Sequence, residues 1–248
     1  MSQATPFITN WRDPDPYINH DSAIVWSILL GKPDSDANPN ECMEHLRGFA
    51  RHSLQGRKNS DYHKHENWEQ FYYVLSGEGE VLIEGEKHHV SEGSVVYFPP
   101  DIRHQMFAED HDNWMEHLIV TCPVDRSGSE ACVFNWRDVT PQTGVHGGVV
   151  TWPLLQADDA PAGPSPRHCL LGFKWLVLQR LIRGKASDSH VHDDFEQIYY
   201  ILEGWGSMMI GGTVHQVAEG DTVYLPAGLE HQIMNEDCDG WLSYLVIS

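Results

Sequence analysis

The sequence predicts an all-β protein built from two copies of one barrel-shaped domain. The first reason is a repeat: the forty-five residues 63–107 align with residues 190–234 without a gap and share twenty identities. The second reason is the strand pattern, in which short apolar segments alternate with turn residues roughly every 8 to 12 positions. No long segment has the period of a helix, so antiparallel strands account for both copies.

The repeat extends beyond its most similar part and sets the domain organisation. Residues 10–13 and residues 135–138 both read Asn-Trp-Arg-Asp, and Trp114 corresponds to Trp241 near the end of each copy. Because the repeat is long and occurs twice, it indicates a duplicated domain and not a solenoid array. We expect an N-terminal domain over residues 1–126 and a C-terminal domain over residues 127–248.

Three pairs of strands are expected in equivalent places of the two copies. Residues 70–75 and 197–202 are rich in Tyr, Ile, Val and Phe, and each segment runs into a Gly-x-Gly turn. Residues 80–83 and 207–210 form the next strands and lead into hairpins at 84–85 and 211–212. Residues 95–98 and 222–225 are short apolar strands that end before a proline.

Composition excludes several classes of function. The formal net charge of -20 disfavours nucleic acid and anionic membranes as partners, and no apolar run approaches the ~20 residues of a membrane span. The N-terminal residues show no signal-peptide pattern, and the five cysteines include no C-x-x-C pair. Reduced thiols in the cytoplasm are therefore expected, with a small molecule as the partner.

Histidines at matching positions predict a metal site in each copy. Two residues apart on a strand, side chains point to the same face, so His63 and His65 can be directed at one point. The same holds for His190 and His192, and a third histidine, His104 or His231, follows in each copy. With sixteen histidines in the chain, a single H-x-H could be a surface feature, but the gap-free repetition favours metal binding. Three imidazoles suit one divalent Zn, Fe, Mn or Ni ion per domain.

These motifs resemble those of the cupin superfamily, and the duplication resembles a bicupin. The first family motif is matched by Gly184, His190, His192, Gln197 and Gly204, with Gln where Glu is usual. The second motif is matched by Gly220, Pro226, Gly228, His231 and Asn235. The N-terminal copy departs from the motifs where Arg57, Asp101 and Ala108 stand. The resemblance implies two tandem jelly-roll barrels, also called double-stranded β-helices.

The fourth metal ligand has two candidates in each copy. The spacing to Gly77 and Gly204 favours Gln70 and Gln197, whereas counting from the H-x-H favours Glu69 and Glu196. Neighbouring residues on a strand face opposite sides, so only one of each pair can reach the metal. We favour the two glutamines. A neutral amide leaves the metal more positive, which favours Lewis-acid chemistry over redox cycling.

Two further pairs of residues are candidates for catalysis. Tyr72 and Tyr199 share a face with the glutamines and could donate a proton, although core packing explains a buried tyrosine equally well. Arg51 and Arg180 lie on expected strands before each H-x-H and could clamp a carboxylate, although a solvated position at the sheet edge is an equal alternative.

The resemblance and the ligand set lead to a hypothesis of function. We expect a metal-dependent enzyme that acts on a small oxygen-rich or carboxylated metabolite by lyase or isomerase chemistry. A non-haem metal dioxygenase of the bicupin type is the first alternative, and a non-catalytic binding or storage cupin is the second. Exposed edge strands in small barrels predict a homodimer.

Overall fold

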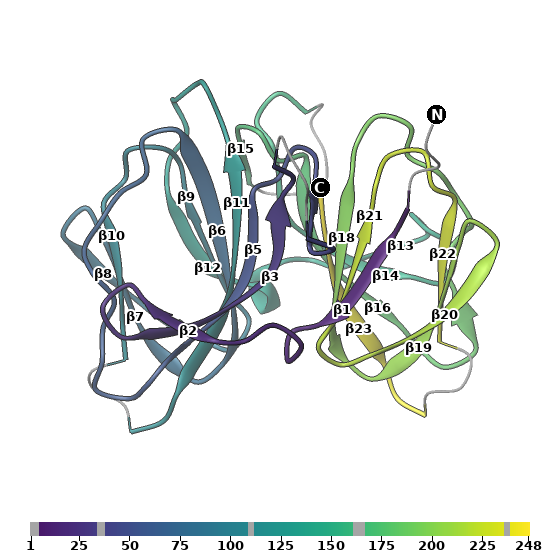
Figure 1. The fold of residues 1–248 in the computed structure, drawn as a ribbon, viewed down its shortest axis with the longest axis horizontal. Helices are drawn as coiled ribbons and strands as arrows, with labels where there is room; N and C mark the ends of the chain where they lie inside the picture. The colour runs from purple at the N-terminus through teal and green to yellow at the C-terminus, as the bar shows by residue number, and fades with distance from the viewer. Residues whose placement is uncertain (1–4, 34–37, 109–111, 161–166, 236–238) are drawn as a thin grey trace.

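The computed structural model describes residues 5–33, 38–108, 112–160, 167–235 and 239–248. It shows two β-barrels side by side, each made of a large sheet that faces a small one (Figure 1). The prediction of an all-β protein with two tandem jelly-roll barrels is therefore confirmed. The described residues contain no helix that is long and apolar enough to cross a membrane.

The N-terminal barrel has an eight-stranded sheet and a three-stranded sheet. Its large sheet contains, in spatial order, β12 (Cys132–Asn135), β9 (Ser94–Phe98), β6 (Trp68–Ser76), β11 (Met115–Pro123), β5 (Gly48–Leu54), β3 (Ala23–Gly31) and β2 (Tyr17–Asn19), with β4 (Glu41–Met43) paired to β3. The small sheet contains β10 (His104–Phe107), β7 (Glu78–Ile83) and β8 (Glu86–Ser91).

The C-terminal barrel repeats this plan. Its large sheet contains, in spatial order, β1 (Phe7–Asn10), β21 (Asp221–Leu225), β18 (Gln197–Glu203), β23 (Leu242–Ile247), β16 (Trp175–Leu181), β14 (Val150–Ala157) and β13 (Gln142–Thr143), with β15 (His168–Leu170) paired to β14. The small sheet contains β17 (Lys185–Ala186), β22 (His231–Asn235), β19 (Trp205–Ile210) and β20 (Thr213–Ala218). A single 3-10 turn, η1 (Trp136–Asp138), follows β12.

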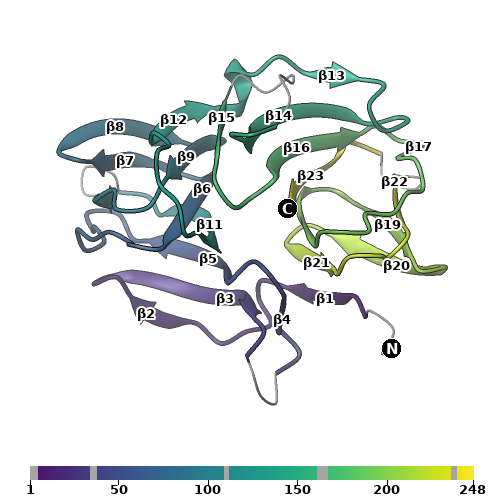
Figure 2. The ribbon, with the colours of Figure 1, turned by 90° about the horizontal axis from the view of Figure 1, so that it is seen from above.

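Two strands cross the expected boundary between residues 126 and 127. β1, at the start of the chain, pairs with β21 of the C-terminal barrel, and Phe7 lies opposite Tyr224 (Figures 1 and 2). β12, beyond residue 127, pairs with β9 of the N-terminal barrel, and Cys132 lies opposite Tyr97. The division 1–126 and 127–248 separates most of each barrel, but each large sheet takes one edge strand from the other half.

The buried apolar residues form three clusters, because each large sheet is apolar on both faces. One cluster fills the interior of each barrel, around Tyr72 and Val74 in the N-terminal half and around Tyr199 and Ile201 in the C-terminal half. The third cluster lies between the barrels and joins residues of both halves, with Phe71 packed on Phe173 at 5.0 Å between ring centroids. The barrels therefore share a continuous core.

A reciprocal pair of buried glutamates adds a polar connection across this shared core. The Glu69 carboxylate accepts hydrogen bonds from the backbone N–H groups of residues 171–173 and from the Tyr97 hydroxyl. In the mirror arrangement, Glu196 accepts from the backbone N–H groups of residues 44–46 and from the Tyr224 hydroxyl. We call these two groups the glutamate latches. Each satisfies a buried charge with donors from the opposite barrel.

Candidate metal centres

In the N-terminal barrel, three histidines come together from the segment before β6 and from the start of β10. An isolated β-bridge joins His63 to His104, and the Nε2 atoms of His63 and His65 are 3.1 Å apart. One ring nitrogen from each of the three residues lies within 4.8 Å of the others. The spacing predicted from the H-x-H motif therefore brings the imidazoles to one point.

The C-terminal barrel holds an equivalent cluster of His190, His192 and His231. A bridge joins His190 to His231, and the three ligand nitrogens again lie within 4.8 Å of one another. The ring centroids of His190 and His192 are 4.8 Å apart, the same distance as between His63 and His65. The duplication has preserved the geometry of the three histidines as well as their sequence positions.

Backbone carbonyl groups fix how the imidazoles are turned. The Nδ1 atoms of His63 and His190 lie 3.2 and 2.9 Å from the carbonyl oxygens of Asp61 and Asp188. The Nδ1 atoms of His104 and His231 are held in the same way, 3.0 and 2.9 Å from carbonyl oxygens. A ring that donates from Nδ1 presents the lone pair of Nε2, which is the orientation that a metal requires.

Buried polar atoms without a partner lie at each cluster. In the described part of the chain, Nε2 of His104 and His231 and Oε1 of Gln70 and Gln197 are buried and form no hydrogen bond. Such atoms are costly unless something satisfies them. All four are lone-pair donors on residues that the sequence assigned to the metal. The residues present therefore fit a divalent ion in each barrel.

Burial favours the neutral form of four of the imidazoles, and metal ligands must be neutral. Desolvation lowers the pKa of His65 to about 4 and that of His104 to about 3. In the C-terminal cluster, desolvation lowers the pKa of His231 to about 4, and it also lowers the pKa of His192. At neutral pH these four rings do not need to lose a proton before they can bind a cation.

Glu69 and Glu196, the alternative candidates for the fourth metal ligand, point away from the histidine clusters. Glu69 and Glu196 form the latches between the barrels, where their carboxylates are fully used. Strand alternation explains the result, because Gln70 and Gln197 then face the barrel interiors. The glutamines stay our proposal for the fourth ligand.

Tyr72 and Tyr199 lie inside the barrels, one beside each cluster. Their ring centroids are 6.0 Å from His104 and 5.9 Å from His231, respectively. Burial raises the pKa of both hydroxyls well above the usual value for tyrosine. Both side chains are therefore protonated phenols that can donate a hydrogen bond beside the histidine clusters.

Arg51 and Arg180, the candidates for clamping a carboxylate, lie outside the cavities beside the histidine clusters, and that role stays a prediction. Arg51 forms an ion pair with Glu116 and donates to the Tyr200 hydroxyl at 3.4 Å, and Arg180 lies 3.8 Å from Glu203. Both arginines line a separate cavity of about 390 Å³ between the barrels. Strand alternation is again the reason, because the residues next to them in sequence take the inward positions.

The inward positions are held by residues that the sequence analysis missed. His52 and Gln179, the neighbours of Arg51 and Arg180, line the barrel interiors. Two further histidines lie behind the N-terminal cluster: His20 stacks on His63 at 4.7 Å between centroids, and His117 lies 5.5 Å from His52. In the C-terminal half, His146 stacks on His190. The repeat in residues 10–30 and 135–155 was the available signal for His20 and His146.

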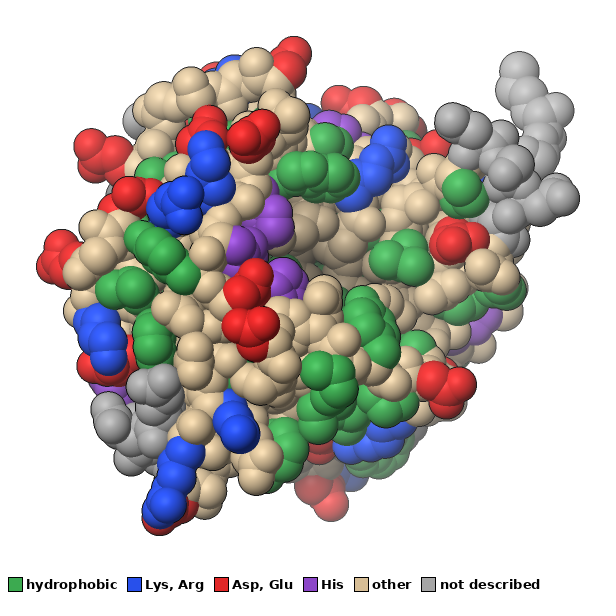
Figure 3. All heavy atoms as spheres, turned by 60° about the vertical axis from the view of Figure 1, so that its left-hand side comes forward, with side chains coloured by type: hydrophobic (Ala, Val, Ile, Leu, Met, Phe, Trp, Pro, Cys, Tyr) green, Lys and Arg blue, Asp and Glu red, His purple; other side chains and the backbone are tan. Residues whose placement is uncertain are grey.

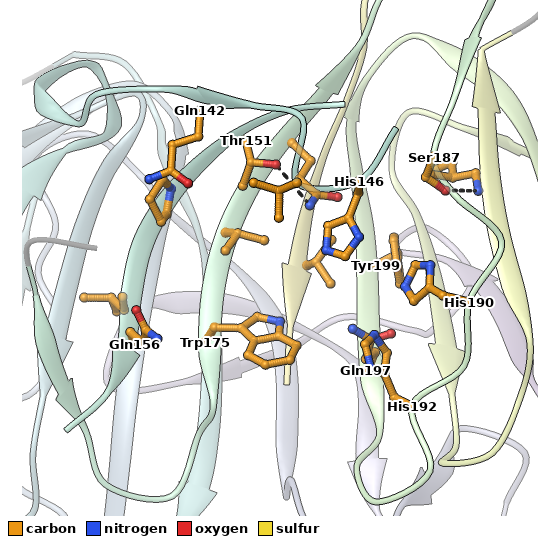
Figure 4. Close-up of a pocket in the computed structure, with 17 residues that line it drawn as sticks. Gln142, His146, Thr151, Gln156, Trp175, Ser187, His190, His192, Gln197 and Tyr199 are labelled. Atoms are coloured by element: carbon orange, nitrogen blue, oxygen red, sulfur yellow. Dashed lines mark hydrogen bonds between the residues drawn. The ribbon is translucent and has the colours of Figure 1, made fainter. Parts of the chain in front are cut away.

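Among the described residues, the two barrels differ in the cavity found beside the histidines. A cavity of about 330 Å³ opens beside His190, His192 and Gln197 and is also lined by Tyr199 and Trp175 (Figure 4). The corresponding space in the N-terminal barrel is about 10 Å³. There, the Phe98 ring stacks on His104 at 4.1 Å between centroids. Figure 3, which brings the N-terminal barrel forward, shows histidine side chains at the surface of that face beside a hollow.

Known proteins share this architecture. Over 98 residues the chain is 29% identical to an uncharacterized protein of Methanocaldococcus jannaschii, covering 40% of this chain and 72% of that protein. The crystal structure of a putative glyoxylate induced protein from Pseudomonas aeruginosa superposes with a TM-score of 0.77 at 19% identity, covering 100% of this chain and 88% of that one. Bacillus subtilis oxalate decarboxylase, studied for its Mn(II) centres, superposes with a TM-score of 0.68 at 16% identity, covering 100% and 78%.

The family comparison agrees with the motifs. The model of the cupin domain matches residues 51–120 and again residues 177–247, which together make up more than half of the chain. Each match contains one complete three-histidine cluster and its glutamine. The resemblance seen in the sequence is therefore confirmed, and the chain belongs to the cupin family, with two cupin domains in tandem.

Proposed function

We propose that the protein is a metal-dependent enzyme that transforms a small oxygen-rich or carboxylated metabolite in its C-terminal barrel. The observation that carries the proposal is the set of unpartnered atoms beside a metabolite-sized cavity. Oε1 of Gln197 and Nε2 of His231 are buried without a partner, and Gln197 lines the cavity together with His190 and His192. A cavity of about 330 Å³ is at the lower end of the range for small-molecule sites.

The structural neighbours support the substrate class but do not decide it. One neighbour is an oxalate decarboxylase with Mn(II) centres, and another is described as a putative glyoxylate induced protein. Both names point to small carboxylated or oxo compounds. At identities of 16% and 19% the likeness concerns the fold alone, so the assignment rests on the residues of the cavity.

The C-terminal site contains the groups that such a reaction needs. A divalent metal held by His190, His192, Gln197 and His231 would polarise a carbonyl or carboxylate oxygen of the substrate. All four ligands are neutral, so no protein charge offsets the cation, which favours lyase or isomerase chemistry over metal redox cycling. The Tyr199 phenol can donate a proton or a hydrogen bond to substrate oxygen.

The N-terminal site is proposed to hold a second ion without a substrate. Its three histidines and Gln70 match the C-terminal set, but the space next to them is about 10 Å³, roughly the room for one water molecule. We therefore propose one divalent metal per barrel and turnover in the C-terminal barrel only.

The test combines elemental analysis with an anaerobic assay. The protein is expected to carry close to two transition-metal ions per chain and to turn over a small 2-oxo or 2-hydroxy carboxylate without O2. Gln197→Glu should retain the metal and lower kcat at least about tenfold, because the added charge weakens the Lewis acid. Gln70→Glu is the matched control and should leave kcat unchanged.

Two results would contradict the proposal. Protein that stays empty after incubation with Zn, Mn, Fe and Ni would remove its basis. Uptake of O2 in proportion to substrate would favour the dioxygenase alternative. The homodimer and the cytoplasmic location expected from the sequence stay predictions; the edge strand β2, with Ile18 65% exposed, is a candidate contact that light scattering can test.

A further inference from the structure

The C-terminal cavity contains no charged side chain among the residues that the structure describes. Its lining consists of apolar side chains, histidines, glutamines and hydroxyl groups, without Lys, Arg, Asp or Glu. This is unusual for a pocket that would handle a multiply charged metabolite, because buried charges need a partner. The chain as a whole carries 52 charged residues, 16 basic and 36 acidic, so their absence here is informative.

Basic residues that lie near the cavity in sequence are turned away from it. Lys174 precedes Trp175, but its Nζ lies 5.0 Å from the ring centroid of Phe195, outside the cavity. The guanidinium of Arg167 lies 3.5 Å from the ring centroid of Phe134, although its backbone oxygen accepts from Gln156. Neither of these two residues lines the cavity.

The cavity wall opposite the ligands combines apolar surface with amide groups. Val177, Leu155 and Trp175 supply apolar surface. Gln142, Gln156 and Gln179 supply neutral hydrogen-bonding groups, and Gln179 donates to the Thr151 hydroxyl at 3.3 Å. The Trp175 indole lies beside the His192 imidazole, with the ring centroids 6.1 Å apart (Figure 4). Such a wall fits an uncharged, partly apolar body that carries hydrogen-bonding atoms.

We propose that the C-terminal cavity selects molecules with one anionic or oxo end and an uncharged, partly apolar body. The anionic end would lie at the histidines, and the body would lie against Val177 and Trp175. A second carboxylate or an ammonium group would lose its hydration and gain no partner, which costs several kcal/mol in a buried site. This inference rests on the proposed metal site and narrows its substrate class away from dicarboxylates and amino acids.

The experiment compares three compounds of similar size on Mn(II)-loaded protein by calorimetry. They are 4-methyl-2-oxopentanoate, with one carboxylate and an apolar body, 2-oxoglutarate, with a second carboxylate, and leucine, with an ammonium group. We expect the first compound to bind at least about tenfold more tightly than either of the others. No turnover is needed, so the measurement reports on the cavity directly.

A charge introduced into the wall should change this preference. Gln156→Arg places a guanidinium at a half-buried position of the lining and is expected to raise the affinity for 2-oxoglutarate at least about fivefold. Gln216→Arg is the control, because it adds the same charge at an exposed position on β20, away from the cavity. The control separates a local ion pair from a general reduction of the net charge of -20.

The outcomes distinguish this inference from the proposed function. If Mn(II) does not bind, the proposed metal site fails, and the selectivity fails with it. If Mn(II) binds but 2-oxoglutarate or leucine matches the monocarboxylate, or if none of the three compounds binds, the selectivity alone is overturned. An equal gain in 2-oxoglutarate affinity for Gln156→Arg and Gln216→Arg would also overturn it.

Discussion

The two barrels have the same candidate metal ligands but different interiors. Behind the ligands, the N-terminal barrel has His52, His117 and Phe98, where the C-terminal barrel has Gln179, Tyr244 and Leu225. His52 and His117 line a space of about 10 Å³, whereas Gln179 lines a cavity of about 330 Å³. The comparison shows that two clusters with the same candidate ligands can differ in the cavity beside them, because the residues next to the ligands differ.

The largest difference between the halves is expected from loss of one histidine ligand. His65→Ala and His192→Ala should each reduce bound metal from two ions to one per chain, because removing a strong ligand costs several kcal/mol of affinity. Turnover should survive in His65→Ala and disappear in His192→Ala. His89→Ala, at an exposed position on β8, is the control and should keep both ions. Equal loss of turnover in the two ligand variants would show that the barrels are not functionally distinct.

The two glutamate latches predict a similar loss of stability in both halves of the molecule. Glu69→Ala and Glu196→Ala each leave three backbone N–H groups of the opposite barrel without an acceptor. We expect each change to lower the free energy of unfolding by about 3–5 kcal/mol, as for other broken buried charge networks. The exposed Glu66→Ala should change it by less than about 0.5 kcal/mol. Urea unfolding measures all three, and latch variants that behave like Glu66→Ala would contradict the prediction.

A smaller effect is expected from enlarging one side chain in each barrel. Val177 lies opposite Val246 in the C-terminal sheet, and Ala50 lies opposite Ile119 in the N-terminal sheet, so the two positions are equivalent. Val177→Phe can extend into the cavity and should cost less than about 1 kcal/mol of stability. Ala50→Phe has no comparable space and should cost about 1–3 kcal/mol. Equal costs in urea unfolding would show that the difference in interior space is not real in solution.

The fold and the histidine clusters could be predicted from the sequence, because both depend on local spacing. The gap-free repeat of His63, His65 and His104 indicated two equivalent barrels, and the structure brings these residues together. Strand alternation also placed Gln70 inside and Glu69 outside. These predictions succeed because a period of two along a strand is a short-range property that one chain displays by itself.

Other features depend on contacts between distant residues and could not be predicted. The positions of Arg51 and Arg180 required the direction of each side chain on its strand, which an isolated arginine does not reveal. His52 and His117 have no histidine counterpart in the second copy, so a search guided by the repeat passes over them. β1 pairs with β21 and β12 pairs with β9, and no local sequence pattern connects the two strands of either pair.

The pairing of β1 with β21 also has a consequence for the order of events during synthesis. Phe7 leaves the ribosome early, but its partner Tyr224 follows 217 positions later. At ~5–20 residues per second, the first strand waits roughly 10–40 s before it can pair. The N-terminal barrel can complete its large sheet as soon as β12 has emerged, since β9 precedes it by about 40 residues. β1 is therefore synthesised well before β21, the strand with which it pairs in the C-terminal sheet.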